Sequence, residues 1–440
     1  MNRRTSHDYL NRCQIDTPVW LAEETWRIAK ERRAEFSHAV DLGAGDGIFA
    51  KTGTFRNYTG YEIDSSRIPE QFDVDNAEII NSCAFSSPLT SFDLAIGNPP
   101  FVRNQELPDG WRKEKQEQLF QETEVSLSGF ANAYQYFILK SLHCADDDGL
   151  CVQIIPYEWI SRPSAQALRN YIRSKGWSVQ IYRMKGLVFP SYDTSATITV
   201  IDKRERDGLW QYFTEIERGK YREQAFSHGG CLQPISFVSP PEKGSALPFA
   251  RRGLSPGSRS VFVLTEEERI SNNLEIERDV LPCITTLRHL PEKVYNITPK
   301  VFHDRYVNED KKCWLLNTER SPSSSLARYL AEVPEADRMS TTCRRRKTWW
   351  KYITPDAPKV LIATGFRSRR PKIAKNTARA IAVGSVAGMY NISNRQTNRI
   401  VKSLSALDLH SRVIEHSKGM RKLEIRQINS LMLDILSIEV

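Results

Sequence analysis

The chain has 440 residues, of which 40% are hydrophobic and 26% are charged, values typical of a globular protein with buried cores. No run of about 18 uncharged apolar residues is present, and no apolar signal core follows the basic N-terminus, which argues against a membrane span or export. The net charge of +9 is uneven, because residues 1–204 hold 23 Lys and Arg against 27 Asp and Glu, whereas residues 205–440 hold 39 against 26. A basic half beside a mildly acidic half indicates that one half contacts a polyanion.

The first 204 residues alternate between helix-like and strand-like segments. Thr17 and Pro18 open an apolar-periodic segment over 19–33, where proline suits the first helical turn and Thr17 can cap it. Strand-like segments cover 39–42, 58–63, 77–80, 92–96, 150–155, 179–183 and 196–201, and helical patterns cover 134–143 and 164–174. This alternation predicts an α/β fold with a mostly parallel sheet of seven strands, covered on both faces.

A glycine-rich loop follows the first predicted strand. Asp41–Gly47 reads D-L-G-A-G-D-G, and its glycines allow a tight turn and a close approach of the backbone to a ligand. The dinucleotide-binding pattern needs a third glycine at the sixth position from Gly43, where this chain has Ile48. The D-x-G-x-G-x-G form, with Gly43 and Gly45 at its centre, instead resembles the first motif of Rossmann-like S-adenosylmethionine methyltransferases, which implies a loop that lies against the methionine end of that cofactor.

An acidic residue lies where such a cofactor needs one. Glu62 ends the second predicted strand, 21 residues after Asp41, with Ile63 beside it. A carboxylate at this place can accept hydrogen bonds from both ribose hydroxyls. Glu62 is therefore the predicted ribose ligand.

The fourth predicted strand ends in Asn98-Pro99-Pro100-Phe101. Two consecutive prolines fix φ and stop the strand. Asn98 is then held at the carboxyl edge of the sheet, which is where ligands bind in open α/β folds. These four residues are the predicted catalytic motif.

The ordered motifs resemble a known family. Thr17-Pro18, Asp41–Gly47, Tyr61–Asp64, Asn98–Phe101 and Gly186–Ile201 follow the order found in gamma-arrangement N6-adenine DNA methyltransferases of restriction–modification systems. The resemblance covers essentially the whole chain. It implies a Rossmann-like catalytic domain that uses S-adenosylmethionine, followed by a mixed α+β target-recognition domain.

The resemblance also implies a set of cofactor ligands. They are Thr17, Pro18, Asp41, Gly43, Gly45, Glu62, Ile63, Ser82, Cys83 and Asn98. The family usually has an acidic residue after the third strand that contacts the cofactor's adenine, but the stretch 81–85 has none, and Ser82 or Asn81 would be a weaker partner. This departure puts the affinity for the cofactor in question more than the type of reaction.

The chemistry of amine methylation explains the catalytic motif. The exocyclic nitrogen of adenine is conjugated with its ring and is a poor nucleophile. The side-chain oxygen of Asn98 and the carbonyl of Pro99 can each accept one of its N–H groups, which favours a pyramidal nitrogen whose lone pair faces the methyl group. No covalent intermediate and no strong general base are needed.

A base inside a duplex is out of reach, so the target adenine must flip out and stack on aromatic side chains. Phe101 and Phe189 are the predicted stacking partners, the second by resemblance to the family. Tyr134 and Tyr136 either border the cofactor and base or pack in the core.

The pattern changes after residue 204. We expect a catalytic domain over 1–204, a Gly-, Ser- and Pro-rich linker over 205–246 and a target-recognition domain over 247–440. The stretches 249–257 and 261–265 resemble the opening of such a domain, and 419–424 resembles its close.

Two basic stretches interleaved with aromatic residues lie in the last third of the chain. Basic side chains bind phosphates, and Arg can also read guanine. The predicted DNA contacts are Arg344, Arg345, Arg346, Lys347, Arg367, Arg369, Arg370 and Lys372. A solvated basic surface over core tryptophans is the competing interpretation.

The expected partner is double-stranded DNA. We expect the chain to be a monomer in the cytoplasm, associated with the nucleoid. None of the eight cysteines forms a CxxC pair, so no zinc or other metal site is expected. A separate cognate restriction endonuclease is implied by the resemblance alone. Two alternatives stay open: a methyltransferase that acts on ribosomal RNA adenine or protein glutamine, and a degenerate methylase that only binds DNA.

Overall fold

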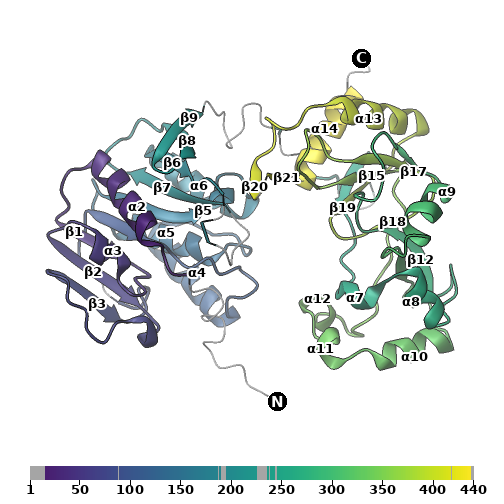
Figure 1. The fold of residues 1–440 in the computed structure, drawn as a ribbon, viewed down its shortest axis with the longest axis horizontal. Coiled ribbons are helices and arrows are strands. Elements are labelled where there is room, and N and C mark those ends of the chain that lie inside the picture. Colours follow the sequence, from purple (N-terminus) through teal and green to yellow (C-terminus); the bar gives the residue numbers. More distant parts are fainter. Residues whose placement is uncertain are drawn as a thin grey trace. The chain divides into compact units, whose positions relative to one another are not determined.

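The computed structural model describes residues 15–87, 89–186, 188–189, 195–224, 235–236, 238–242, 245–417 and 419–437. The described residues form two compact units that meet in the chain at residues 232–233, with 416–418 grouped with the first unit. Figure 1 shows the two units, in purple to teal and in teal to yellow, and each is described by itself.

The N-terminal unit is built on one mixed sheet of nine strands in the order β3-β2-β1-β4-β5-β7-β6-β8-β9. The bounds of the strands are β1 His38–Asp41, β2 Asn57–Glu62, β3 Ala77–Asn81, β4 Leu94–Gly97, β5 Leu150–Pro156, β6 Ser178–Arg183, β7 Ala196–Asp202, β8 Trp210–Glu217 and β9 Lys220–Gln224. Its α-helices are α2 Val19–Arg32, α3 Ile48–Thr52, α4 Asp109–Thr123, α5 Ala133–Cys144 and α6 Gln166–Ser174. The seven expected strands are β1 to β7, of which β7 is antiparallel to both β5 and β6.

The expected boundary at residue 204 and part of the expected linker are wrong. Strand β8 pairs in parallel with β6, and β9 pairs antiparallel with β8, so 210–224 extend the sheet. Strand β8 buries only two of its eight residues, without the alternation that marks a half-buried strand. The sheet is therefore larger and more mixed than the sequence predicts.

Both faces of the sheet are covered. All residues of β4, β5 and β7 are buried, which requires packing on both sides because successive side chains point to opposite faces. Helix α2 contributes Leu21, Trp26 and Ile28 to a core cluster with Leu94 and Ile96 of β4. The Trp26 indole N–H donates to the carbonyl of Phe49 at 2.8 Å, which fixes α2 against α3.

This topology gathers four loops at one edge. Strands β3, β2, β1, β4 and β5 are mutually parallel neighbours, so their carboxyl ends lie at the same edge of the sheet. The glycine loop follows β1, Glu62 ends β2, Ser82 follows β3 and Asn98 follows β4. Residues far apart in the chain can thus form one site.

The C-terminal unit mixes short strands and helices. Its strands form a five-stranded sheet, β10-β19-β15-β17-β13, a four-stranded sheet, β11-β14-β12-β18, and the pair β16-β21. The bounds of its strands are β10 Phe249–Arg252, β11 Val263–Leu264, β12 Val280–Ile284, β13 Asn296–Ile297, β14 Trp314–Leu316, β15 Val360–Ala363, β16 Gly365–Phe366, β17 Ile373–Asn376, β18 Ile381–Ala382, β19 Val386–Tyr390, β20 Glu415–Ser417 and β21 Met420–Lys422. Its α-helices are α7 Arg259–Phe262, α8 Glu266–Ser271, α9 Pro299–Phe302, α10 Ser324–Glu332, α11 Glu335–Arg338, α12 Thr341–Arg344, α13 Asn394–Ala406 and α14 Ile425–Ser437.

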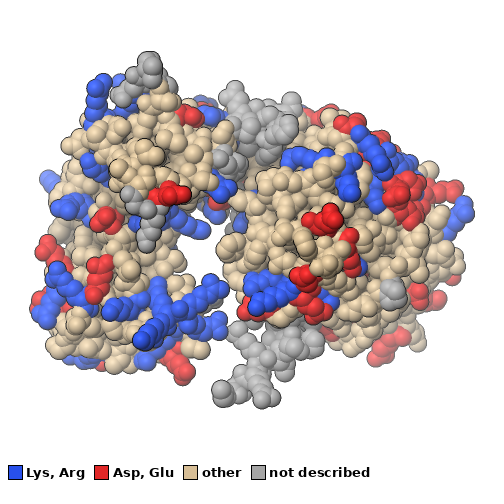
Figure 2. Space-filling model, turned by 180° about the vertical axis from the view of Figure 1, so that it is seen from behind, with Lys and Arg blue, Asp and Glu red and all other residues tan. Residues whose placement is uncertain are grey.

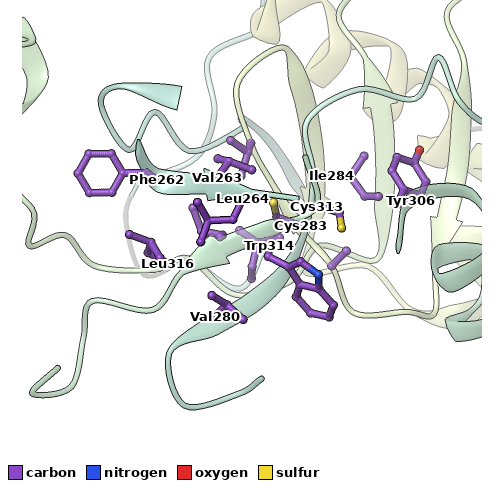
Figure 3. Packing of buried hydrophobic residues seen from close by; sticks show 14 of the residues in the cluster. Phe262, Val263, Leu264, Val280, Cys283, Ile284, Tyr306, Cys313, Trp314 and Leu316 are labelled. Carbon is purple, nitrogen blue, oxygen red and sulfur yellow. The ribbon is translucent and has the colours of Figure 1, made fainter. Parts of the chain in front are cut away.

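The core of this unit lies around the four-stranded sheet. Figure 3 shows buried side chains of this core from α7, β11, β12 and β14, among them Phe262, Leu264, Val280, Trp314 and Leu316. Among the described residues, no helix has the length and apolar character that a membrane crossing requires. Within the same described ranges, no three His, Cys, Asp or Glu side chains group closely enough to hold a metal ion.

Candidate cofactor and catalytic site

The glycine loop between β1 and α3 contains two residues with left-handed backbone angles. Gly45 has φ +54° and Gly47 has φ +77°, backbone angles that residues other than glycine rarely adopt. The Gly43 N–H donates to Oδ1 of Asp41 at 3.0 Å, so the last residue of β1 anchors the turn. The sequence requires glycine here for conformation as well as for access.

Glu62 closes the other side of this loop. Its Oε2 accepts from the Gly45 N–H at 2.9 Å and its Oε1 accepts from the Asp64 N–H at 2.8 Å, with 7% of the residue exposed. A carboxylate can accept about four hydrogen bonds. Each oxygen therefore retains capacity for a ligand hydroxyl while the backbone holds the carboxylate in place.

One pocket at this edge collects most of the predicted ligands. Eight of the ten line it: Thr17, Gly43, Gly45, Glu62, Ile63, Ser82, Cys83 and Asn98. Asp41 and Pro18 are not among its lining residues: Asp41 is 2% exposed, and Pro18 is the N-cap of α2. Their predicted contact with the cofactor stays a prediction.

The burial of Asp41 has an electrostatic consequence. The residue is 2% exposed, and this burial raises the pKa of the carboxyl to about 7, because it disfavours the charged form. Its hydrogen bonds from the Gly43 N–H and from the Tyr58 hydroxyl, at 3.3 Å, oppose that rise. Asp41 thus changes charge near neutral pH, directly under the loop.

Three aromatic side chains at one end of the pocket were missed by the sequence analysis. The ring of Phe85 lies 5.7 Å from Trp111 and 5.1 Å from Phe137, edge to face in both cases. They come from the loop after β3, from α4 and from α5, so no local spacing in the sequence links them. Of the two proposed substitutes for the missing acid, Ser82 lines the pocket, whereas Asn81 donates its amide to the Glu62 carbonyl at 2.9 Å.

Arg67 was also missed. Its guanidinium lies in the pocket, where a Cβ placed on Gly45 would come within 3.1 Å of Nη2. The same nitrogen pairs with the carboxylate of Asp16, which immediately precedes Thr17. A pair between residues 51 positions apart gives no local signal in the sequence.

The catalytic motif leaves β4 at the rim of this pocket. The Asn98 side chain donates through Nδ2 to the Thr17 hydroxyl at 3.1 Å. Its Oδ1 is buried and has no hydrogen-bond partner in the described part of the chain. A buried acceptor without a partner costs about 1–3 kcal/mol, so a bound donor would be stabilised here. Thr17 does not cap α2 as expected, since the structure has Pro18 at the N-cap without a side-chain bond.

Phe101 and Phe189 are brought together but not exposed. Their ring centroids are 5.8 Å apart at 85°, and the residues are 4% and 1% exposed. Both belong to the core cluster under α2. Stacking a base on either ring requires this mutual contact to open, so the stacking role stays a prediction. Leu187 and 190–194 of the predicted stretch lie outside the described residues.

Tyr134 and Tyr136 are core residues. Both are fully buried, neither lines the pocket, and burial raises the pKa of each phenol. The ring of Tyr136 packs on Trp111 at 5.5 Å. The core interpretation therefore holds for both.

The basic residues of the C-terminal unit divide into two kinds. Arg344, Arg345 and Lys347 are exposed at the end of α12. Arg346 instead donates to the Pro256 carbonyl at 2.7 Å and lies 5.2 Å from the ring of Tyr352. These contacts stabilise the local fold, and the DNA contact of Arg346 stays a prediction. Trp349 packs against the core.

The second basic stretch surrounds a groove of about 400 Å³. Arg367 and Arg370 line it and are exposed, and Arg369 is exposed nearby. Lys372 also lines the groove, where it donates to the carbonyls of Arg288 and Leu290, and its predicted DNA contact stays a prediction. Figure 2 shows basic side chains gathered in several patches on one face of the molecule.

The comparisons with known proteins follow the two units. A family model for the Eco57I restriction-modification methylase matches residues 48–189, and one for the C-terminal domain of the Type II methyltransferase M.Eco57I matches residues 248–411. Type II methyltransferase M.AccI of Acinetobacter calcoaceticus is 21% identical over 397 residues, which cover 82% of this chain and 72% of M.AccI. Type II methyltransferase M.HincII of Haemophilus influenzae is 29% identical over 166 residues, which cover 37% of this chain and 31% of M.HincII.

A solved structure shares the fold over most of the chain. The Type IIL restriction-modification enzyme MmeI, solved in complex with DNA, matches with a TM-score of 0.57 and 11% identity, over 93% of this chain and 64% of that one. This likeness supports the fold. The two family models, each of which matches about a third of the chain, and the named Type II methyltransferases together support a restriction-modification DNA methyltransferase.

Proposed function

We propose that this chain transfers a methyl group from S-adenosylmethionine to the N6 amine of a flipped-out adenine within a specific DNA sequence, as the modification component of a restriction–modification system. The observation that carries the proposal is the buried, unpartnered Oδ1 of Asn98 at the rim of the pocket. An amine with two N–H groups is the kind of ligand that such an acceptor needs.

The residues of the pocket fit the cofactor. Glu62 would hold the ribose hydroxyls, Arg67 the carboxylate of the methionine part, and Phe85 with Trp111 and Phe137 the adenine ring. Aromatic contact in place of the family's acidic residue supplies packing without a hydrogen bond. When bound, S-adenosylmethionine supplies an electrophilic methyl group on a sulfonium.

The chain's own residues prepare the acceptor amine. Asn98 Oδ1 accepts one N–H, and the Pro99 carbonyl accepts the other. Two acceptors held off the ring plane favour the pyramidal nitrogen, and their fixed positions remove the need to reorganise during the reaction. As the new N–C bond forms, the bond from the methyl group to the sulfonium sulfur would break, and the proton that the amine gives up would pass to solvent.

Methyl transfer to different substrates tests the proposal. The full chain is incubated with methyl-labelled S-adenosylmethionine and, in parallel, with genomic DNA, ribosomal RNA or a peptide-chain release factor, and the nucleosides are separated. We expect label in N6-methyldeoxyadenosine alone. Label in RNA or protein would favour the first alternative, and cofactor binding without transfer to any substrate would favour the degenerate methylase. The basic C-terminal unit favours a nucleic acid over a protein glutamine, because a polyanion is the partner that such a surface attracts.

Glu62→Gln is expected to weaken cofactor binding by roughly 10- to 100-fold, since charge-assisted hydrogen bonds contribute about 1.5–3 kcal/mol. The amide keeps the size of the side chain but offers a donor where the Gly45 or Asp64 N–H needs an acceptor. Calorimetry with S-adenosylmethionine measures the effect, with the exposed Glu23→Gln on α2 as the matched control. Equal affinities of both variants would contradict the assignment of Glu62.

Replacing both Arg369 and Arg370 with alanine is expected to lower DNA affinity and to reduce the slope of log affinity against log salt by about 1–2. Lys372→Ala is the matched comparison, because its ammonium is bound to two backbone carbonyls. We expect it to lower the melting temperature while the salt slope is kept. Fluorescence anisotropy with labelled duplex DNA at several salt concentrations measures the slope for both variants, and thermal unfolding gives the melting temperature. A slope unchanged in the double variant would refute the contact.

A further inference from the structure

The amide of Asn98 can face the substrate in two ways, and only one is productive. A rotation of 180° exchanges Oδ1 and Nδ2, which have nearly the same size. The oxygen accepts an N–H from the target amine, whereas the NH₂ group would present donors to donors. The reaction proposed above therefore depends on a device that holds one orientation.

Thr17 supplies such a device. Its hydroxyl oxygen accepts from Asn98 Nδ2 at 3.1 Å, across 81 residues of chain. Thr17 itself is fixed, because the carbonyl of the next residue, Pro18, accepts from the N–H groups of Leu21 and Ala22 at the start of α2. The Thr17 hydroxyl makes no capping hydrogen bond to that helix.

The opposite orientation is disfavoured by its unmet hydrogen bonds. With the amide turned, the Thr17 hydroxyl would donate to Oδ1, which would occupy the one strong acceptor of the side chain. Both hydrogens of Nδ2 would then point to the place that Oδ1 takes now, and the N–H groups of the target amine would meet donors instead of an acceptor. With the amine in place, a buried donor left without an acceptor costs about 1–3 kcal/mol, which favours the orientation that the Thr17 hydroxyl holds now.

We propose that Thr17 is a positioning residue for methyl transfer: its hydroxyl sets the orientation of the Asn98 amide, so that Oδ1 faces the amine of the target base. This inference rests on the proposed function. It assigns to Thr17 a task beyond contact with the cofactor, and it links the segment before α2 to the catalytic motif after β4.

A double-mutant cycle with Asn98→Asp tests the inference. The two oxygens of a carboxylate are equivalent acceptors, so no orientation has to be chosen. Thr17→Val keeps the shape of the side chain and removes the hydroxyl. We expect Thr17→Val to lower kcat at least about 10-fold in the wild-type background and less than about 3-fold in the Asn98→Asp background.

Two further measurements separate positioning from other roles. Thr17→Ser keeps the hydroxyl, and we expect it to restore most of the kcat lost in Thr17→Val. Because Thr17 also lines the cofactor pocket, kcat is measured at saturating S-adenosylmethionine, and calorimetry gives any loss of cofactor affinity separately. Melting temperatures check that each variant folds. These readouts keep the test decisive even where Asn98→Asp has too little activity for the cycle.

The outcomes are distinct. A loss of kcat that is equal in both backgrounds, or a loss that appears only as a higher KM for the cofactor, overturns the positioning role while the proposed function stands. A wild-type chain that transfers no methyl group to DNA overturns the proposed function and this inference with it.

Discussion

Replacing Asn98 with alanine is expected to lower the rate of methyl transfer by about 10²- to 10³-fold, the loss typical of removing one preorganised acceptor or donor from an active site. The variant loses the buried acceptor Oδ1, which has no partner among the described residues, and the hydrogen bond from Nδ2 to the Thr17 hydroxyl. It keeps the glycine loop and Glu62, which hold the cofactor side of the pocket. The loss should therefore appear in kcat, with the dissociation constant for S-adenosylmethionine changed by less than about 3-fold.

Single-turnover kinetics on labelled DNA measures this loss, and calorimetry measures the affinity for the cofactor. Asn57→Ala is the matched control, because Asn57 is an exposed asparagine at the start of β2. An Asn98→Ala variant that transfers methyl groups at the rate of the control would contradict the catalytic role of Asn98.

Asp41 is expected to make the stability of the chain fall as the pH rises from about 5 to 7. Burial raises the pKa of Asp41 to about 7 in the folded chain, whereas the unfolded value is about 3.9. Between these values the folded state binds a proton that the unfolded state has released. The stabilisation is thus complete below about pH 4 and is lost as the pH rises through 7, by roughly 1.4 kcal/mol per pH unit at most.

Asp41→Asn isolates this effect, since the amide resembles the protonated carboxyl in shape and charge. Its oxygen can still accept from the Gly43 N–H. Urea unfolding of both chains at pH 5, 6, 7 and 8 gives the difference in the free energy of unfolding. We expect wild type to lose stability relative to the variant over this range, by a few kcal/mol in total. Parallel curves would show that Asp41 keeps its charge in the folded state.

The elements that the sequence predicts well are those with a strong local signal. Strands β1 to β7 are short apolar runs between polar turns, and each is found within a few residues of its expected place. The glycine loop and the catalytic motif carry their conformation in glycine and proline, so their positions were also predictable. Parallel pairing then brings Glu62 and Asn98 to one edge without further information.

The features that were missed depend on contacts between distant residues. Phe85, Trp111 and Phe137 meet through tertiary packing, and the Arg67–Asp16 pair joins two loops. Strands β8 and β9 show no regular alternation of buried and exposed residues. No pattern in the sequence indicates that these segments extend the sheet.

The basic runs show what the sequence cannot predict, namely which partner each charged side chain binds. The sequence presents Arg346 and Lys372 as members of two uniform basic runs. In the structure each of them donates to backbone carbonyls, while their neighbours Arg345 and Arg370 are exposed. The charge of a run is visible in the sequence, but the acceptor that each cation finds is decided by the fold.

A structure of the full chain with an inert cofactor analogue and a duplex containing its methylation site tests the central claim most directly. We predict an extrahelical adenine whose N6 lies within hydrogen-bond distance of Asn98 Oδ1 and the Pro99 carbonyl, with Nδ2 still bound to Thr17. An adenine that stays stacked in the duplex, or an Asn98 side chain turned away from the extruded base, would contradict it.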